Sequence, residues 1–304
     1  MGVNLKDEII KLKREKNAII LAHFYQPRDV QEVADYVGDS YFLSKMGKEC
    51  KENTIVFCGV KFMAESAKIL SPNKKVIFPT PNATCPMANM ITKEDVLTLK
   101  ENHPNAKVVC YINSTAEVKS VADVCCTSSN AIDIVKNLES DEIIFLPDKN
   151  LGSYIQEKVP NKKIILWDGY CYVHNKIKAS DIINAKKKYG ENIKVLVHPE
   201  CRKEVRDLAD YIGSTKGIIN FVAKDNGKKY LIITEYGIIP ELKKRNPHKE
   251  FYMLDMYCSN MKKNSINEVY KCLKNYSSEV NIDENIRKKA VRSLEKMHSL
   301  GVGV

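Results

Sequence analysis

The sequence predicts an α/β protein of three homologous αβα domains, each with a small parallel sheet. The first observation is an internal repeat with a shared Val/Leu-Ala-Asp core, which aligns without a gap at residues 23–40, 111–128 and 198–215. The second is a cysteine that recurs at spacings of 86 and 87 residues, as Cys85, Cys171 and Cys258. Solenoid units span only about 20–50 residues, so we expect each copy to be a domain.

The third observation is the order of elements within each copy: strand, helix, strand, helix, strand, and a turn that carries the cysteine. The apolar runs are continuous rather than alternating, which is typical of parallel strands buried on both faces. Alternating strands and helices indicate βαβ units, with helices on both faces of each sheet. We predict helices at 30–37 and 62–70 in the first copy, and strands at 18–22, 54–58, 75–78, 107–111, 142–146, 163–167, 194–197, 230–234 and 251–254.

The repeats place the domains at residues 1–90, 91–176 and 177–262, followed by a helical tail at 263–304. A helix at 5–16 resembles those that precede the strands of the later copies, so the boundaries can shift by one helix. The tail is expected to close the core, and a lid over the domain junction is the alternative. Its apolar positions at helical spacing are Val269, Leu273, Ala290, Leu294 and Met297.

Composition limits the classes of function. A hydrophobic content of 44% in 304 residues is enough for globular cores. No apolar run reaches the roughly 18 residues of a membrane span, and the N-terminus lacks a signal-peptide core, so we expect a cytoplasmic protein without a membrane partner. The net charge of +10 comes from dispersed lysines, which predicts no nucleic-acid partner but favours small anionic substrates.

Three columns of the repeat fall at the carboxyl ends of strands, where open parallel sheets collect their functional residues. Singly, a hydroxyl there is usually a helix N-cap and a histidine is usually structural. A pseudo-threefold axis that relates the copies would instead aim all these side chains at one cavity. The columns are His23, Tyr111 and His198 at the strand end, Tyr25, Asn113 and Glu200 two residues later, and Ser40, Ser128 and Thr215 after the next helix.

Ten cysteines in a chain without an export signal indicate thiols that are buried, catalytic or metal-bound. Structural zinc usually has four ligands with two cysteines close in sequence, and this chain has no CxxC. Three thiolates from three domains instead suit a 4Fe-4S cluster with one iron free of protein ligands. Such an iron is a Lewis acid, which predicts dehydration chemistry. Off the repeat spacing, and so expected to be buried thiols, are Cys50, Cys58, Cys110, Cys125, Cys126, Cys201 and Cys272.

The chain resembles the quinolinate synthase family (quinolinate synthetase A protein) over nearly its whole length. The resemblance is carried by AHFYQ (22–26), GDS (38–40), GVKFMAE (59–65), TCPMA (84–88), YINSTAEVK (111–119), TSSNA (127–131), PDKNLG (147–152), HPEC (198–201), GST (213–215) and the stretches 169–174 and 258–264.

This resemblance implies three αβα domains about a pseudo-threefold axis and a 4Fe-4S cluster held by Cys85, Cys171 and Cys258. It implies condensation of iminoaspartate (iminosuccinate) with dihydroxyacetone phosphate to quinolinate, phosphate and water in NAD biosynthesis. A transient contact with the L-aspartate oxidase that makes iminoaspartate is also implied. The substrate-binding residues would be His23, Ser40, Tyr111, Asn113, Ser128, His198, Glu200 and Thr215.

Proton transfer is expected to involve residues of the same columns, because tautomerisation, ring closure and dehydration need positioned acids and bases. The candidates are Tyr25, Glu200, His198 and Tyr111. His174, three residues past Cys171, either supports the cluster ligands or is a structural helix-start histidine. Ser259 departs from the proline that the family commonly has after the third cysteine, but it leaves the sulfur in place.

Other classes stay open from the residues alone. Another iron-sulfur hydro-lyase would share the open iron. An electron-transfer or structural iron-sulfur protein would need a fourth ligand and no ring of hydroxyls. A solute-binding module would have no use for spaced cysteines, and protein that is colourless after anaerobic purification would favour it.

Overall fold

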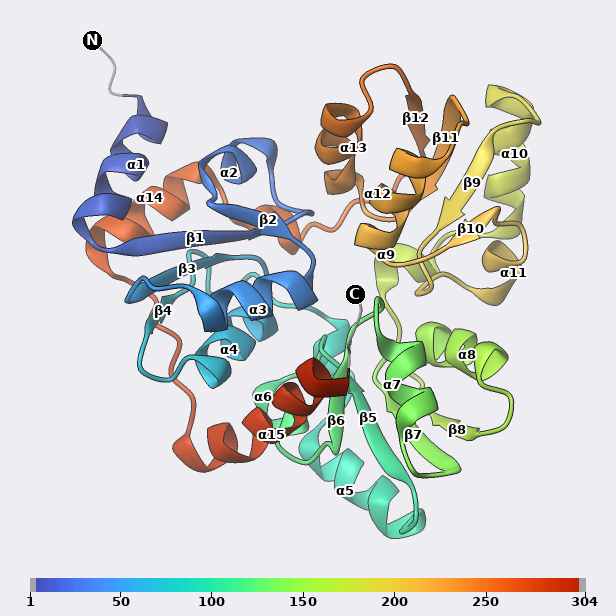
Figure 1. Cartoon of the computed structure of the whole chain (residues 1–304), viewed down its shortest axis with the longest axis horizontal. Helices are drawn as coiled ribbons and strands as arrows, with labels where there is room; N and C mark the ends of the chain where they lie inside the picture. The colour runs from blue at the N-terminus through green and yellow to red at the C-terminus, as the bar shows by residue number, and fades with distance from the viewer. Residues whose placement is uncertain (1–3, 301–304) are drawn as a thin grey trace.

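The computed structural model describes residues 4–300 and contains three small sheets of four parallel strands (Figure 1). Each sheet is made from one repeat, which confirms the predicted α/β class. The predicted strands agree with the structure to within one residue at either end. The first sheet, in the order β2-β1-β3-β4, consists of β1 (Ala18–His23), β2 (Tyr36–Gly38), β3 (Thr54–Cys58) and β4 (Lys75–Ile77).

The other two sheets repeat this strand order. The second, β6-β5-β7-β8, consists of β5 (Lys107–Tyr111), β6 (Val124–Cys126), β7 (Glu142–Leu146) and β8 (Lys163–Leu166). The third, β10-β9-β11-β12, consists of β9 (Lys194–Val197), β10 (Tyr211–Ile212), β11 (Lys229–Ile233) and β12 (Glu250–Met253). The pseudo-threefold axis and the domain limits stay predictions, and the shared strand order is what such an axis would require.

The short edge strands β2, β6 and β10 are additions to the predicted pattern, and the predicted helix at 30–37 is wrong beyond Val33. The helix preceding each edge strand is short: α2 (Arg28–Val33), α6 (Ala116–Lys119) and α11 (Lys203–Arg206). The aspartate of the repeat core lies between this helix and the edge strand, and its carboxylate accepts a hydrogen bond from the neighbouring central strand. These bonds run from the N–H of Ile20 to Asp35 (2.8 Å), of Val108 to Asp123 (2.8 Å) and of Val195 to Asp210 (2.7 Å).

The central strands are buried along almost their whole length, as their continuous apolar runs predict. The outer strands β8 and β12 differ, since their residues are half-buried or exposed at the sheet edge. The remaining helices are α1 (Leu5–Glu15), α3 (Ser40–Glu49), α4 (Lys61–Leu70), α5 (Lys93–Asn102), α7 (Ala131–Asn137), α8 (Lys149–Lys158), α9 (Tyr172–Asn175), α10 (Ala179–Tyr189), α12 (Thr215–Lys224), α13 (Ile239–Arg245), α14 (Ile266–Asn275) and α15 (Glu284–Leu300), with 3-10 turns η1 (Met87–Asn89), η2 (Tyr236–Ile238) and η3 (Met261–Lys263). No described helix has the length and apolar character to cross a membrane.

The described part of the C-terminal tail closes the core, as expected. Helix α14 packs on α1 and adds Val269 and Leu273 to the apolar layer on one face of the first sheet. Helix α15 adds Ala290, Leu294 and Met297 to the core that the first two repeats share. Neither helix lines the central pocket described below.

Buried polar contacts join the repeats in pairs around the centre of the molecule. Burying such groups is tolerated only when they find partners, so these contacts help to fix how the repeats meet. The carboxylate of Glu65 accepts a hydrogen bond from the N–H of Ala116 (3.3 Å), the Arg206 guanidinium donates to the carbonyl of Asn150 (3.0 Å), and the Tyr25 hydroxyl lies 2.7 Å from Oγ1 of Thr215.

Candidate functional site

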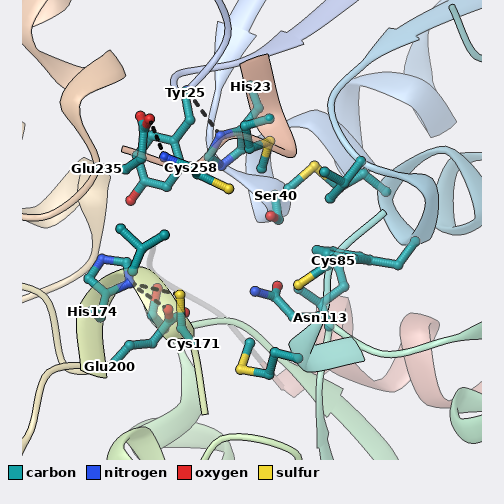
Figure 2. Close-up of a pocket in the computed structure, with 18 of the residues that line it drawn as sticks. His23, Tyr25, Ser40, Cys85, Asn113, Cys171, His174, Glu200, Glu235 and Cys258 are labelled. Carbon is teal, nitrogen blue, oxygen red and sulfur yellow. Dashed lines mark hydrogen bonds and ion pairs between the residues drawn. The ribbon is translucent and has the colours of Figure 1, made fainter. Parts of the chain in front are cut away.

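One pocket lies where the three repeats meet, and it encloses about 820 Å³ of space free of protein atoms, its mouth included (Figure 2). The pocket brings together every residue that the sequence predicts for the site: His23, Tyr25, Ser40, Cys85, Tyr111, Asn113, Ser128, Cys171, His198, Glu200, Thr215 and Cys258.

Strand register explains why the first and third columns of the repeat meet. His23 ends β1 and pairs with Gly38 of β2, so the chain enters Ser40 and α3 beside it. Tyr111 ends β5 and pairs with Cys126 of β6 in the same way. Side chains that are far apart in sequence therefore share the carboxyl edge of one sheet.

The two histidines are oriented identically by their own turns. Nδ1 of His23 accepts a hydrogen bond from the N–H of Tyr25 (3.1 Å), and Nδ1 of His198 accepts one from the N–H of Glu200 (3.3 Å). Burial lowers the pKa of both imidazoles from 6.5 to about 3. Each ring is therefore neutral near pH 7, and because Nδ1 accepts, Nε2 carries the proton and can donate to a ligand.

The same burial predicts a stability that depends on pH. Between pH 6.5 and about 3, the unfolded chain protonates His23 and His198 while the folded chain does not. The free energy of unfolding of the apo-protein should therefore fall with decreasing pH, by up to about 1.4 kcal/mol per pH unit for each histidine. When the free energy of unfolding is measured by urea titration between pH 7 and pH 5, its slope against pH should be shallower for His198→Gln than for the wild type. Equal slopes would contradict this.

The hydroxyls of the third column are not helix N-caps. Asp39 caps α3 by accepting from the N–H of Phe42 (2.9 Å), and Ser214 caps α12 by accepting from the N–H of Gly217 (3.1 Å). Ser40 and Thr215 are the first residues of these helices, and their side chains line the pocket. Helix N-termini attract anions, so these two positions suit carboxylate or phosphate groups.

Glu200 is the centre of a buried hydrogen-bonded group. Its carboxylate accepts from the hydroxyl of Tyr111 (2.5 Å) and lies 2.9 Å from Nδ1 of His174. Burial raises its pKa, but the adjacent imidazoles of His174 and His198 and the hydrogen bonds from His174 and Tyr111 outweigh burial. The pKa of Glu200 is therefore below its usual range, and the group is a carboxylate at neutral pH.

His174 connects this carboxylate to two other parts of the site. Nδ1 of His174 lies 3.2 Å from Sγ of Cys171, and Nε2 lies 3.0 Å from Oγ1 of Thr234. Thr234 in turn lies 2.8 Å from the hydroxyl of Tyr25. Burial raises the pKa of Tyr25 well above 10, so it stays protonated. The geometry favours the interpretation that His174 supports the cysteine rather than only starting α9.

The three predicted metal-binding cysteines turn their sulfur atoms toward one space in Figure 2. All are free thiols, and each lies in the turn that follows the last strand of its repeat. Burial raises the pKa of all three thiols, that of Cys85 to about 12. The nearby Cys258 and Glu200 raise the pKa of Cys85 further. Three thiols from three directions fit a shared iron-sulfur group.

A second grouping of ligand atoms occurs beside these thiols. The ligand atoms of Cys171, His174 and Glu200 lie within 4.8 Å of one another. The hydrogen bonds already described account for this closeness, so we assign no separate metal to it.

The other seven cysteines are predicted to be buried thiols, and all but one of them are fully buried. Six are buried, whereas Cys50 is half-buried, and none of the seven lines the pocket. Ser259 leaves the third cysteine turn intact, because the N–H of Cys258 still donates to Glu235 (3.2 Å) and the Ser259 hydroxyl lies 3.3 Å from that of Tyr172.

Several pocket residues escaped the sequence analysis, Glu235 above all. Its buried carboxylate lies 3.2 Å from the ammonium of Lys262. Glu235 stands two residues past β11, where the first and second repeats have Val60 and Asp148. The column is not chemically uniform, so comparing the copies did not mark it. The other unpredicted polar lining residues are Asp39, Thr84, Thr127 and Tyr172.

Comparisons with known proteins agree with this site. The family model described as quinolinate synthetase A protein matches residues 7–299. A protein of Clostridium novyi named quinolinate synthase is 82% identical, covering 99% of this chain and 100% of its own length. Proteins with the same name from Clostridium perfringens and Clostridioides difficile are 58% and 55% identical, covering 98% and 100% of this chain and 100% of their own lengths. The chain therefore belongs to the quinolinate synthetase A protein family.

Proposed function

We propose that this chain is a quinolinate synthase, which condenses iminoaspartate with dihydroxyacetone phosphate to quinolinate, phosphate and water in NAD biosynthesis. Membership of the family supports the reaction. The observation that carries the proposal is the convergence of one cysteine, one strand end and one hydroxyl from each repeat on a single pocket. The cytoplasmic location and a transient contact with the L-aspartate oxidase that makes iminoaspartate stay predictions.

The proposed cofactor is a 4Fe-4S cluster held by Cys85, Cys171 and Cys258. No fourth cysteine lines the pocket within residues 4–300, which supports an iron without a protein ligand. Such an iron would act as a Lewis acid that holds a substrate hydroxyl or carboxylate and assists loss of water.

The protein's own groups would bind the anionic parts of the substrates. His23 and His198 can donate from Nε2, and the hydroxyls of Ser40, Ser128 and Thr215 are further donors. The side-chain oxygen of Asn113 is buried and has no hydrogen-bond partner in the protein. Unpaired buried polar atoms are rare in native proteins, so Asn113 supports the presence of a polar ligand at this position.

Tyr25 and Glu200 are proposed to transfer protons. Glu200 is ionised and can accept a proton, whereas Tyr25 is protonated and can donate one. Tyr111 and His198 would hold Glu200 and the substrate in place, through the hydroxyl bond to Glu200 and the Nε2 donor.

The test is product formation by anaerobically reconstituted protein. Iron and sulfide are counted, and the protein is then incubated with dihydroxyacetone phosphate and with oxaloacetate plus ammonia as the source of iminoaspartate. We expect about four irons per chain, and quinolinate and phosphate in equal amounts. A cluster that forms and transfers electrons without yielding quinolinate would favour the electron-transfer alternative. Protein that stays colourless would contradict the cofactor and the mechanism.

A further inference from the structure

One position of the repeat, two residues past β3, β7 or β11, helps to hold the turn that carries the metal-binding cysteine. It is Val60 after β3, Asp148 after β7 and Glu235 after β11. In each repeat, the next residue donates its N–H to the carbonyl two residues before the cysteine. These bonds join Lys61 to Ala83 (2.8 Å), Lys149 to Gly169 (2.8 Å) and Tyr236 to Met256 (2.9 Å).

Two of the three repeats add a carboxylate to this shared bond. Oδ2 of Asp148 accepts a hydrogen bond from the N–H of Cys171, and Oε1 of Glu235 accepts one from the N–H of Cys258, both at 3.2 Å. Figure 2 shows Glu235 beside Cys258. The two side chains are 0% and 1% exposed, so water does not compete for these bonds.

The second oxygen of each carboxylate is used in the same way in both repeats. Oδ1 of Asp148 accepts from the N–H of Leu151 (2.8 Å) and starts α8. Oε2 of Glu235 accepts from the N–H of Gly237 (2.6 Å) and starts η2. Each of these side chains therefore links the backbone of its cysteine to the start of a helix, α8 in the second repeat and η2 in the third.

The first repeat lacks this contact, because the side chain of Val60 has no hydrogen-bond acceptor. Its cysteine turn is instead tied across a repeat boundary, where the side-chain amide of Asn260 donates to the carbonyl of Thr84 (2.6 Å). The backbones of Cys171 and Cys258 are thus held by a side-chain oxygen from their own repeat, and the turn of Cys85 by an amide from the third repeat.

We propose that Asp148 and Glu235 are positioning residues that hold the backbone of Cys171 and Cys258 in the geometry needed to ligate the cluster. The proposal rests on the cluster assigned above. Groups that orient metal ligands typically contribute about 10–100-fold to metal retention.

The variants Asp148→Asn and Glu235→Gln test this with little change of shape. Asparagine is as good an N-cap as aspartate, so α8 keeps its start while one acceptor is lost. Glu65→Gln is the matched control, because Glu65 is also a buried carboxylate that accepts a backbone N–H, but not one from a cysteine turn.

Two measurements separate positioning from general stability. In apo-protein, amide hydrogen exchange should speed up around Cys171 in Asp148→Asn and around Cys258 in Glu235→Gln, and at neither turn in Glu65→Gln. In reconstituted protein, an iron chelator should bleach the cluster about 10–100-fold faster in the first two variants.

Cluster loss at the wild-type rate in both variants would overturn the proposal, and so would exchange that rises evenly along the chain. Failure of the wild type to take up a cluster would overturn the proposed function and, with it, the ligation role. Faster exchange confined to the two cysteine turns would still establish that the carboxylates order them.

Discussion

Cys85→Ser, Cys171→Ser and Cys258→Ser are each expected to abolish both cluster assembly and quinolinate formation. Each repeat supplies one of the three thiols that line the pocket, and no other cysteine within residues 4–300 lines it to substitute. Serine keeps the size of the side chain but replaces a soft thiolate by an oxygen, which is a poor ligand for an iron-sulfur cluster. Iron and sulfide counts and the visible absorption spectrum after anaerobic reconstitution measure the loss directly.

Cys50→Ser is the matched control for these variants. Cys50 is half-buried like the three ligands but does not line the pocket, and the ammonium of Lys74 is 2.9 Å from its sulfur. This variant should assemble the cluster and make quinolinate like the wild type. A full cluster in any of the three ligand variants would show that the ligand set is wrong, and the pocket would then need another metal ligand.

Repetition is the reason that so much of the fold could be predicted. Three copies of one strand and helix order identified the sheets, since buried parallel strands have long continuous apolar runs. The edge strands β2, β6 and β10 escaped because they are two or three residues long, which is too short to give a recognisable apolar run. Asp35, Asp123 and Asp210 were visible as a column, but their pairing with a neighbouring strand depends on the sheet having formed.

The candidate site could likewise be predicted only in part. The cysteine column and the hydroxyl column, which contain Cys85 and Ser40, are chemically uniform and could be selected by comparing copies, and all members of both columns line the pocket. Glu235 and Thr234 could not, because their partners lie in other turns and repeats, and no sequence spacing encodes those contacts. The substrate-binding roles came from the family resemblance and the cluster-ligand role from the cysteine spacing, whereas the structure adds which groups meet and which are ionised.

Tyr25→Phe is expected to lower kcat for quinolinate formation by about 100-fold to 10,000-fold, the usual contribution of a positioned acid or base. The change removes one oxygen and keeps the ring, which packs edge-on against His23 at a centroid distance of 4.5 Å. Cluster content and KM should therefore stay near the wild-type values. The loss should arise in proton transfer, because the hydroxyl that Thr215 and Thr234 hold in the pocket is gone.

Tyr230→Phe separates this loss from the general effect of removing a buried hydroxyl. The Tyr230 hydroxyl donates to Asp225 (2.7 Å) in the third repeat, and Tyr230 does not line the pocket. Its variant should keep kcat within about tenfold of the wild type, since it lacks any contact that could contribute such a catalytic factor. If Tyr25→Phe also stayed within that range, Tyr25 would only bind or pack. Glu200, ionised and bonded to Tyr111 and His174, would then have to exchange protons with another donor in the pocket.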